Sequence, residues 1–140
     1  MSNADDLFGQ QHVERYRETD GDTGHDWKGT QTLLLTTRGR RSGEEHTTPL
    51  IYGRSDGAFL VVASKGGSDQ PPGWYLNLEA EPEVGVQVKG DRFRARARSA
   101  TAEEKPALWR VMTDQWPDYD KYQQQTEREI PVVVLEPILS

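Results

Sequence analysis

Short segments that are apolar or alternate between apolar and polar residues recur along this chain and are separated by turn residues, a pattern typical of β-strands. Six segments rich in apolar, β-branched or alternating residues are predicted to be strands: 32–37, 45–54, 58–64, 83–89, 92–99 and 131–136. Pro49 predicts an edge position or a bulge within the second of these strands. Asp56-Gly57 and Gly90-Asp91 predict tight hairpins between neighbouring strands.

The remaining segments predict a few short helices and loops. Four segments are expected to be helical: 5–19, 74–80, 101–114 and 116–125. The first has a weak apolar stripe, and Asp5 or Asp6 can cap it. Thr101 and Glu104 have the spacing of a capping box. Residues 20–29 and 65–73 are rich in glycine and polar residues or proline, which predicts loops.

Many short strands with few helices predict a mainly β fold with flanking helices, of the α+β class. Tight hairpins favour a small antiparallel barrel or sandwich over a doubly wound parallel sheet. The chain has 140 residues, which fits one domain spanning 1–140. Neither a Gly-x-Gly-x-x-Gly fingerprint nor a Walker loop is present, which argues against the nucleotide-binding folds that use them.

Composition excludes several further classes of protein. The chain has no cysteine, so disulfide scaffolds, iron–sulfur sites and cysteine nucleophiles are excluded. The three histidines lack metal-ligand spacing, so we expect no metal: His12, His25 and His46. The longest apolar stretch, 130–135, is far shorter than the ~20 residues that span a bilayer. The polar N-terminus does not resemble a signal peptide, so we expect a cytoplasmic protein without stable membrane insertion.

The charge distribution predicts a small anionic ligand. The formal net charge is −6, which argues against a nucleic-acid partner. Basic residues nevertheless gather in two zones, 38–41 and 89–98. In the second zone the arginines alternate along the predicted strand and therefore share one face: Arg92, Arg94, Arg96 and Arg98. That face is interpreted either as a solvated surface paired with acids on a neighbouring strand, or as a track for an acidic tail.

Three local patterns can carry chemistry, although each also has an ordinary structural interpretation. The turn Arg38–Gly43 offers guanidiniums, a hydroxyl and tight backbone geometry suited to phosphate, or it is a solvated basic turn. Adjacent glycines in Ala63–Gly67 allow a flat ligand to approach the backbone, or form a strand exit. Trp116, Tyr119 and Tyr122 share one helical face, which suits a planar substrate or packing onto the barrel.

These patterns occur together in an order that resembles the deazaflavin-dependent nitroreductase family. The resemblance is carried by Arg40–Gly43, Pro49-Leu50, Ala63–Gly67, Pro72–Leu78 and Pro82, and by the C-terminal segments Tyr119–Tyr122 and Thr126–Pro131. It covers about residues 12 to 138. It implies an antiparallel split β-barrel, similar to the barrels that bind flavin mononucleotide. It also implies coenzyme F420, an 8-hydroxy-5-deazaflavin with a phosphate and an oligoglutamate tail.

The resemblance implies a hydride transfer from the reduced coenzyme to a small organic acceptor: a quinone, an activated double bond or a nitroaromatic. The implied phosphate-binding residues are Arg40, Arg41 and Ser42, with His46 nearby. Other implied cofactor-binding residues are Pro49, Ala63, Ser64, Lys65, Gly66 and Asn77. The implied substrate-binding residues are Ile51, Trp116, Tyr119 and Tyr122. Either tyrosine is expected to act in catalysis by orienting the acceptor or supplying a proton.

The sequence departs from the family pattern at three of these positions. His46 replaces a residue that is often basic, and Ile51 and Trp116 stand where the nitroimidazole reductase has tyrosine. The last two changes argue against nitroimidazole reduction. Two alternatives stay open, a flavin mononucleotide-dependent oxidoreductase on the same barrel and a non-enzymatic carrier of coenzyme F420. A monomer and a homodimer are both compatible with the sequence.

Overall fold

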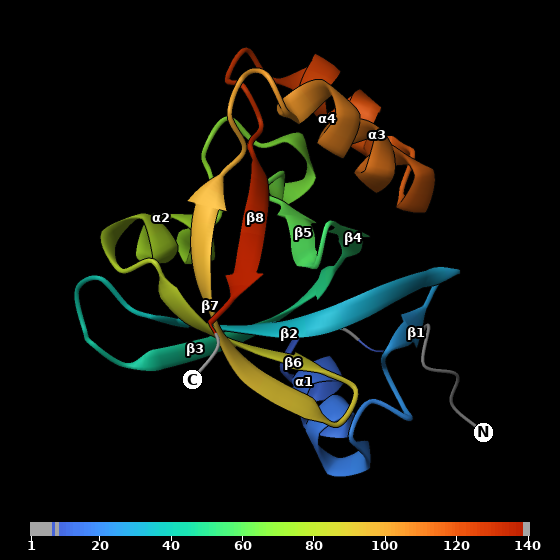
Figure 1. Cartoon of the computed structure of the whole chain (residues 1–140), viewed down its shortest axis with the longest axis vertical. Helices are drawn as coiled ribbons and strands as arrows, with labels where there is room; N and C mark the ends of the chain where they lie inside the picture. The colour runs from blue at the N-terminus through green and yellow to red at the C-terminus, as the bar shows by residue number, and fades with distance from the viewer. Residues whose placement is uncertain (1–6, 8, 139–140) are drawn as a thin grey trace.

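The computed structural model describes residues 7 and 9–138, and most of the described strands join one curled antiparallel sheet. The strands of the described residues are β1 (Asp26–Trp27), β2 (Thr30–Arg38), β3 (Glu45–Ile51), β4 (Gly53–Ser55), β5 (Ala58–Val62), β6 (Glu83–Val88), β7 (Asp91–Ser99) and β8 (Val132–Pro137). Their order is β1-β2-β6-β7-β8-β5-β4, and β3 pairs separately with β2. The sheet curls into a split barrel, as Figure 1 shows.

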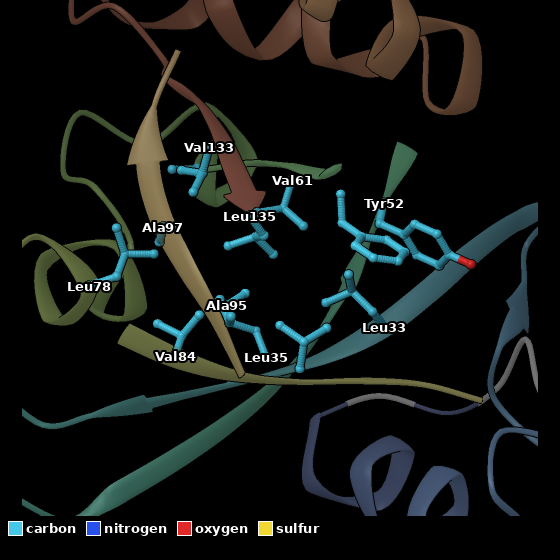
Figure 2. Close-up of a cluster of buried hydrophobic side chains, with 13 residues drawn as sticks. Leu33, Leu35, Tyr52, Val61, Leu78, Val84, Ala95, Ala97, Val133 and Leu135 are labelled. Carbon is cyan, nitrogen blue, oxygen red and sulfur yellow. The ribbon is translucent and has the colours of Figure 1, made fainter. Parts of the chain in front are cut away.

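The interior of the barrel holds one hydrophobic cluster, and the helices at one end cover a second. Figure 2 shows the first cluster, which includes Val61, Val133 and Leu135. Their sequence neighbours Leu60 and Val134 belong to the second cluster, outside the barrel. Successive side chains of a strand point to opposite faces, so β5 and β8 are buried on both faces. This explains why their sequences are continuously apolar rather than alternating.

In Figure 1, α3 and α4 lie at one end of the curled sheet, α1 lies at the other end, and α2 lies at its side. Their bounds are α1 (Gly9–Thr19), α2 (Gly73–Ala80), α3 (Lys105–Gln115) and α4 (Asp118–Gln125). Tyr16 fixes α1 to the sheet, because its hydroxyl donates to the Thr32 carbonyl at 3.0 Å and accepts from the Lys89 N–H at 2.8 Å. Burial raises the pKa of this phenol to about 12. Within the described residues, no helix has the length and apolar character needed to cross a bilayer.

The predicted fold class is confirmed, and two local predictions are wrong. The segment 45–54 is not one strand, because β3 ends at Ile51 and β4 begins at Gly53. At Tyr52 the chain leaves its pairing with β2 and begins to pair with β5. The buried Tyr52 hydroxyl forms a hydrogen bond with His25 Nε2 at 2.9 Å, so this polar group has a partner where the strand is interrupted. The predicted loop 20–29 contains the short strand β1, which pairs with β2.

Other local predictions are confirmed. Pro49 lies in β3, an edge strand whose ladder partner is β2 alone. The two hydrogen bonds of the capping box form, with the Thr101 N–H donating to Glu104 Oε1 at 2.8 Å and the Glu104 N–H donating to Thr101 Oγ1 at 3.3 Å. The helix itself begins later than predicted, at Lys105 rather than Thr101. The expected N-cap residues Asp5 and Asp6 lie outside the described residues, where the start of the predicted helix 5–19 also falls.

The alternating arginines of β7 lie on one face, and three of the four form ion pairs with carboxylates of described residues: Arg92, Arg94 and Arg98. Arg94 lies 3.7 Å from Glu83 of β6, and Arg98 lies 3.3 Å from Glu136 of β8. Arg96 faces the same two strands, opposite Glu83 and Glu136 in the ladder. This arrangement supports the paired, solvated interpretation of the face.

Candidate functional site

A cavity of about 450 Å³ lies where β3, the segment after β5, α4 and the N-terminal part of the chain converge. This size falls within the roughly 300–1,000 Å³ of small-molecule pockets. The lining is mainly apolar and aromatic and comes from Leu7, Gly9, His12, Trp27, Thr32, Thr48–Ile51, Val62, Ser64–Gly66, Pro72, Trp74, Trp116, Tyr119 and Tyr122. We call this cavity the pocket.

Two tryptophans from distant parts of the chain form an aromatic wall of the pocket. The rings of Trp27 and Trp116 are stacked, with centroids 6.2 Å apart and planes inclined by 28°. Trp27 Nε1 also donates to the Leu7 carbonyl at 3.0 Å. The stack joins the N-terminal part of the chain to the segment between α3 and α4. Flat aromatic walls suit a planar ligand.

Residues 64–66 form another wall of the pocket, and Gly66 and the following Gly67 have left-handed backbone conformations. Gly66 and Gly67 have φ angles of 63° and 87°, which favour glycine. A Cβ on Gly67 would lie 2.9 Å from the Tyr122 carbonyl oxygen and 2.7 Å from Gln125 Oε1. A Cβ on Gly66 would meet no protein atom within 4 Å. Gly67 therefore permits close packing against α4, whereas Gly66 leaves open space beside the pocket.

Arg128 holds the same segment from outside the pocket. Its Nε donates to the Ser68 carbonyl at 2.8 Å, and its Nη2 donates to the carbonyls of Ser64 at 2.8 Å and Ala63 at 3.2 Å. Thr126 adds a hydrogen bond to Asp69 at 2.7 Å. The forked guanidinium thus fixes three carbonyls of one loop. The C-terminal motif that resembles the family therefore supports the loop that forms the pocket wall.

The two tyrosines of α4 face the pocket with different surroundings. Tyr119 is buried, and its hydroxyl has no hydrogen-bond partner among the described residues. Burial, assisted by the neighbouring Tyr122, raises the pKa of Tyr119 well above its usual value. The Tyr122 hydroxyl accepts from Trp116 Nε1 at 3.2 Å and keeps its own proton available. Both phenols can therefore donate a hydrogen bond to a ligand.

The basic turn lies at the tip of the β2–β3 hairpin, beside α2 (Figure 1). Within residues 39–44, the N–H groups of Arg41 and Ser42 have no described partner, whereas the others are hydrogen-bonded. Arg38 pairs with Glu81 at 3.8 Å, but Arg40 and Arg41 pair with no described carboxylate. These cations and N–H groups suit an anion.

Asn77 connects this turn to α2. Its buried Oδ1 accepts from the Arg40 N–H at 3.2 Å and from Arg40 Nη1 at 3.0 Å. Its Nδ2 donates to Thr37 Oγ1 at 3.3 Å. Because α2 begins at Gly73, next to the pocket residues Pro72 and Trp74, the helix links the basic turn to the pocket.

The structure brings most of the sequence-predicted site residues to the pocket but not all. Those that line it are Pro49, Ile51, Ser64, Lys65, Gly66, Trp116, Tyr119 and Tyr122. The turn residues Arg40, Arg41, Ser42 and His46 lie outside the lining, as do Asn77 and the fully buried Ala63. Sequence reasoning missed His12 and Trp27. The four-residue spacing of His12 and Tyr16 could have indicated that both share the buried face of α1.

The donor set fits a planar group that carries an anionic end. Lys65 lines the pocket, and Arg40 and Arg41 lie in the turn beside α2. None of these three cations pairs with a carboxylate among the described residues, so all three can bind an anionic group of a ligand. Open space beside Gly66 and the aromatic walls leave room for a flat ring system. The fold and the donor set therefore fit a split-barrel protein that binds a flavin or a deazaflavin.

Comparison with known proteins shows the family to which the chain belongs. The family model described as F420H(2)-dependent quinone reductase matches residues 8–137. The F420H(2)-dependent quinone reductase of Mycobacterium tuberculosis strain H37Rv is 41% identical over 128 residues, which cover 89% of this chain and 86% of that protein. The chain belongs to the F420H(2)-dependent quinone reductase family. It is an oxidoreductase whose cofactor is coenzyme F420, as the resemblance predicted.

Solved structures agree with this assignment. An F420-H2 dependent reductase, FDR-A, superposes with a TM-score of 0.70 at 37% identity, covering 75% of this chain and 93% of that chain. A second structure, described as a domain-swapped dimer, superposes with a TM-score of 0.73 at 35% identity and covers 91% and 96% of the two chains. The split-barrel prediction is thereby confirmed.

Proposed function

We propose that this enzyme reduces quinones with the reduced form of coenzyme F420, and that the acceptor binds in the pocket. The observation that carries this proposal is the convergence of the 64–66 wall and both phenols of α4 on one aromatic-walled cavity. When bound, the reduced coenzyme supplies a hydride to the acceptor. The protein supplies binding, orientation and the placement of a proton.

In this proposal, Ser64, Lys65 and Gly66 hold the ring of the coenzyme. Arg40, Arg41 and Ser42 hold its phosphate, and His46 of β3 lies beside them, opposite Thr37 in the ladder. Pro49 and Ile51 form the wall that faces this segment. Asn77 and Ala63 act indirectly, because Asn77 fixes Arg40 and the Ala63 carbonyl accepts a hydrogen bond from Arg128.

The phenols of α4 hold the acceptor in this proposal. A quinone oxygen gains negative charge as the ring takes up a hydride, and a preorganised O–H donor stabilises that charge. Tyr119 is suited to this because its raised pKa keeps the phenol protonated across the neutral pH range. Tyr122 is oriented by the indole of Trp116, which leaves its O–H free to donate. Trp116 contributes the flat surface beside the acceptor.

We expect Tyr119→Phe and Tyr122→Phe each to lower kcat by about tenfold or more, because each removes a donor to the developing oxyanion. The dissociation constant for the coenzyme should stay close to that of the wild type. Tyr75→Phe is the matched control, because the Tyr75 hydroxyl bonds to Ser99 and lies outside the pocket lining. Unchanged turnover in both α4 variants would remove the phenols from the mechanism.

We expect Arg41→Gln to weaken binding of coenzyme F420 by about tenfold, because a charge-assisted contact to phosphate contributes roughly 1.5 kcal/mol. The variant should also lose part of the salt dependence of binding. Arg15→Gln is the control, since it removes the same charge from an exposed position on α1. Equal affinities of the Arg41 variant and the wild type would place the phosphate elsewhere.

Steady-state oxidation of the reduced coenzyme with menadione tests the proposed reaction. We expect turnover with this quinone and slower turnover with nitroimidazoles, because Ile51 and Trp116 replace the tyrosines of the nitroimidazole reductase. Parallel assays with an enone and a nitroaromatic measure how far the acceptor range extends. Tight coenzyme binding without oxidation by any of these acceptors would contradict the reaction and favour a carrier role.

A further inference from the structure

His12 of α1 lines the pocket but has no part in the reaction proposed above. The residue is only 2% exposed, and its Nε2 lies 2.8 Å from the Gly24 carbonyl oxygen. A carbonyl oxygen accepts hydrogen bonds and cannot donate them, so Nε2 carries the proton. In the neutral imidazole, the other nitrogen, Nδ1, is then a hydrogen-bond acceptor.

His12 Nδ1 has no hydrogen-bond partner among the described residues and is not fully buried. No described residue donates to this atom, since the hydrogen bonds of the ring to described residues all involve Nε2. Across residues 7 and 9–138, however, no fully buried side-chain nitrogen or oxygen lacks a partner. Nδ1 therefore touches open space, and the cavity that His12 lines is the pocket. Burial lowers the pKa of His12 and thereby favours the neutral imidazole, whereas the hydrogen bond to Gly24 raises the pKa by a smaller amount.

Two donors that lie beside His12 are already engaged with backbone carbonyls. The Thr32 hydroxyl donates to the Gly24 carbonyl at 2.6 Å, and Trp27 Nε1 donates to the Leu7 carbonyl. The rings of His12 and Trp27 lie side by side, with centroids 6.0 Å apart. This end of the pocket thus combines the Trp27 ring with the acceptor His12 Nδ1. A ligand that fits both has an aromatic ring and a hydroxyl group that can donate a hydrogen bond.

We propose that His12 Nδ1 binds a hydroxyl of the quinol product, which rests on the proposed reduction of quinones in this pocket. A quinone has carbonyl oxygens, which cannot donate to Nδ1. The hydride brings two electrons and a hydrogen, and a proton completes the quinol, whose new O–H groups can donate. The hydrogen bond to His12 is therefore made by the reduced form and not by the oxidised form.

Calorimetry with two redox-inert probes tests this inference on protein saturated with oxidised coenzyme F420. The probes are 2-naphthol, which carries a hydroxyl, and 2-methoxynaphthalene, which lacks its proton. We expect the wild type to bind 2-naphthol about tenfold more tightly, as one buried hydrogen bond predicts. Binding of both probes with equal affinity, or of neither, would overturn the inference.

Two amide variants separate ligand binding from structural support. In His12→Gln the amide N–H can reach the Gly24 carbonyl, but the acceptor at the Nδ1 position is lost. In His12→Asn the amide oxygen stands near the Nδ1 position, but the bond to Gly24 is lost. We expect the glutamine variant to keep a Tm near the wild type and to lose the 2-naphthol preference, and the asparagine variant to show the reverse.

A 2-naphthol preference that survives in the glutamine variant would assign the contact to another group and overturn the inference. Failure of the proposed function gives a different result, because the wild type would then not oxidise the reduced coenzyme with menadione at all. Menadione turnover without any 2-naphthol preference would leave the reaction intact and refute the role of His12.

Discussion

Replacing Arg128 with methionine is expected to weaken the binding of coenzyme F420 by about thirtyfold, which corresponds to roughly 2 kcal/mol. The guanidinium fixes the carbonyls of Ala63, Ser64 and Ser68, and no other described side chain donates to these three atoms. Without it, the loop that forms the pocket wall must order itself on binding, and this ordering costs affinity. A fluorescence titration of the variant with the coenzyme measures the effect.

Two controls separate this positioning role from a general loss of stability. Arg128→Lys keeps the charge, but one ammonium cannot reproduce the fork to three carbonyls, so most of the affinity should still be lost. Arg110→Met removes an exposed arginine of α3 that makes no ion pair with a described residue, and it should bind normally. If Arg128→Met lowered the Tm but left the dissociation constant unchanged, Arg128 would serve the fold alone.

The second large effect is expected at Gly67. Gly67→Ala should lower the free energy of unfolding by about 3 kcal/mol, through left-handed strain of roughly 1–2 kcal/mol and overpacking of a similar size. The added methyl would lie 2.9 Å from the Tyr122 carbonyl oxygen and 3.0 Å from the Tyr122 Cα, both backbone atoms of α4. Denaturant unfolding of the variant and the wild type measures the difference.

The neighbouring glycine is the matched control. A methyl at Gly66 meets no protein atom within 4 Å, so Gly66→Ala should cost only the strain of its φ of 63°, about 1 kcal/mol. Because Gly66 lines the pocket, its variant should instead weaken coenzyme binding. Equal stabilities of the two variants would show that the contact between the loop and α4 does not constrain position 67.

Local sequence signals predicted the elements that depend on neighbouring residues. The hairpin at Asp56-Gly57 and the hydrogen bonds between Thr101 and Glu104 each involve residues within a few positions of one another. The second hairpin also forms, but its turn residues are Lys89 and Gly90, because Asp91 already pairs with Val88 in the ladder. The break at Tyr52 could not be predicted in the same way, because it reflects a change of partner strand. The short strand β1 likewise exists only because β2 extends far enough to pair with it.

The same distinction applies to the site. Family motifs pointed to the 64–66 wall and to the aromatic residues of α4, which now line one pocket. His12 and Trp27 reach that pocket only through the packing of the N-terminal part of the chain, which no motif indicated. The role of Arg128 depends on carbonyls about sixty residues earlier in the chain. Side-chain partners at such separations follow from the tertiary fold and not from spacing.

Titration of the purified protein with oxidised coenzyme F420, and separately with flavin mononucleotide, tests the central claim most directly. Three of the four tryptophans, Trp27, Trp74 and Trp116, line the pocket, so their fluorescence reports its occupancy. We expect saturable quenching by coenzyme F420 at micromolar concentrations, retained in a Trp109→Phe control, and much weaker binding of flavin mononucleotide. Equal or tighter binding of flavin mononucleotide, or no quenching by coenzyme F420, would contradict the account.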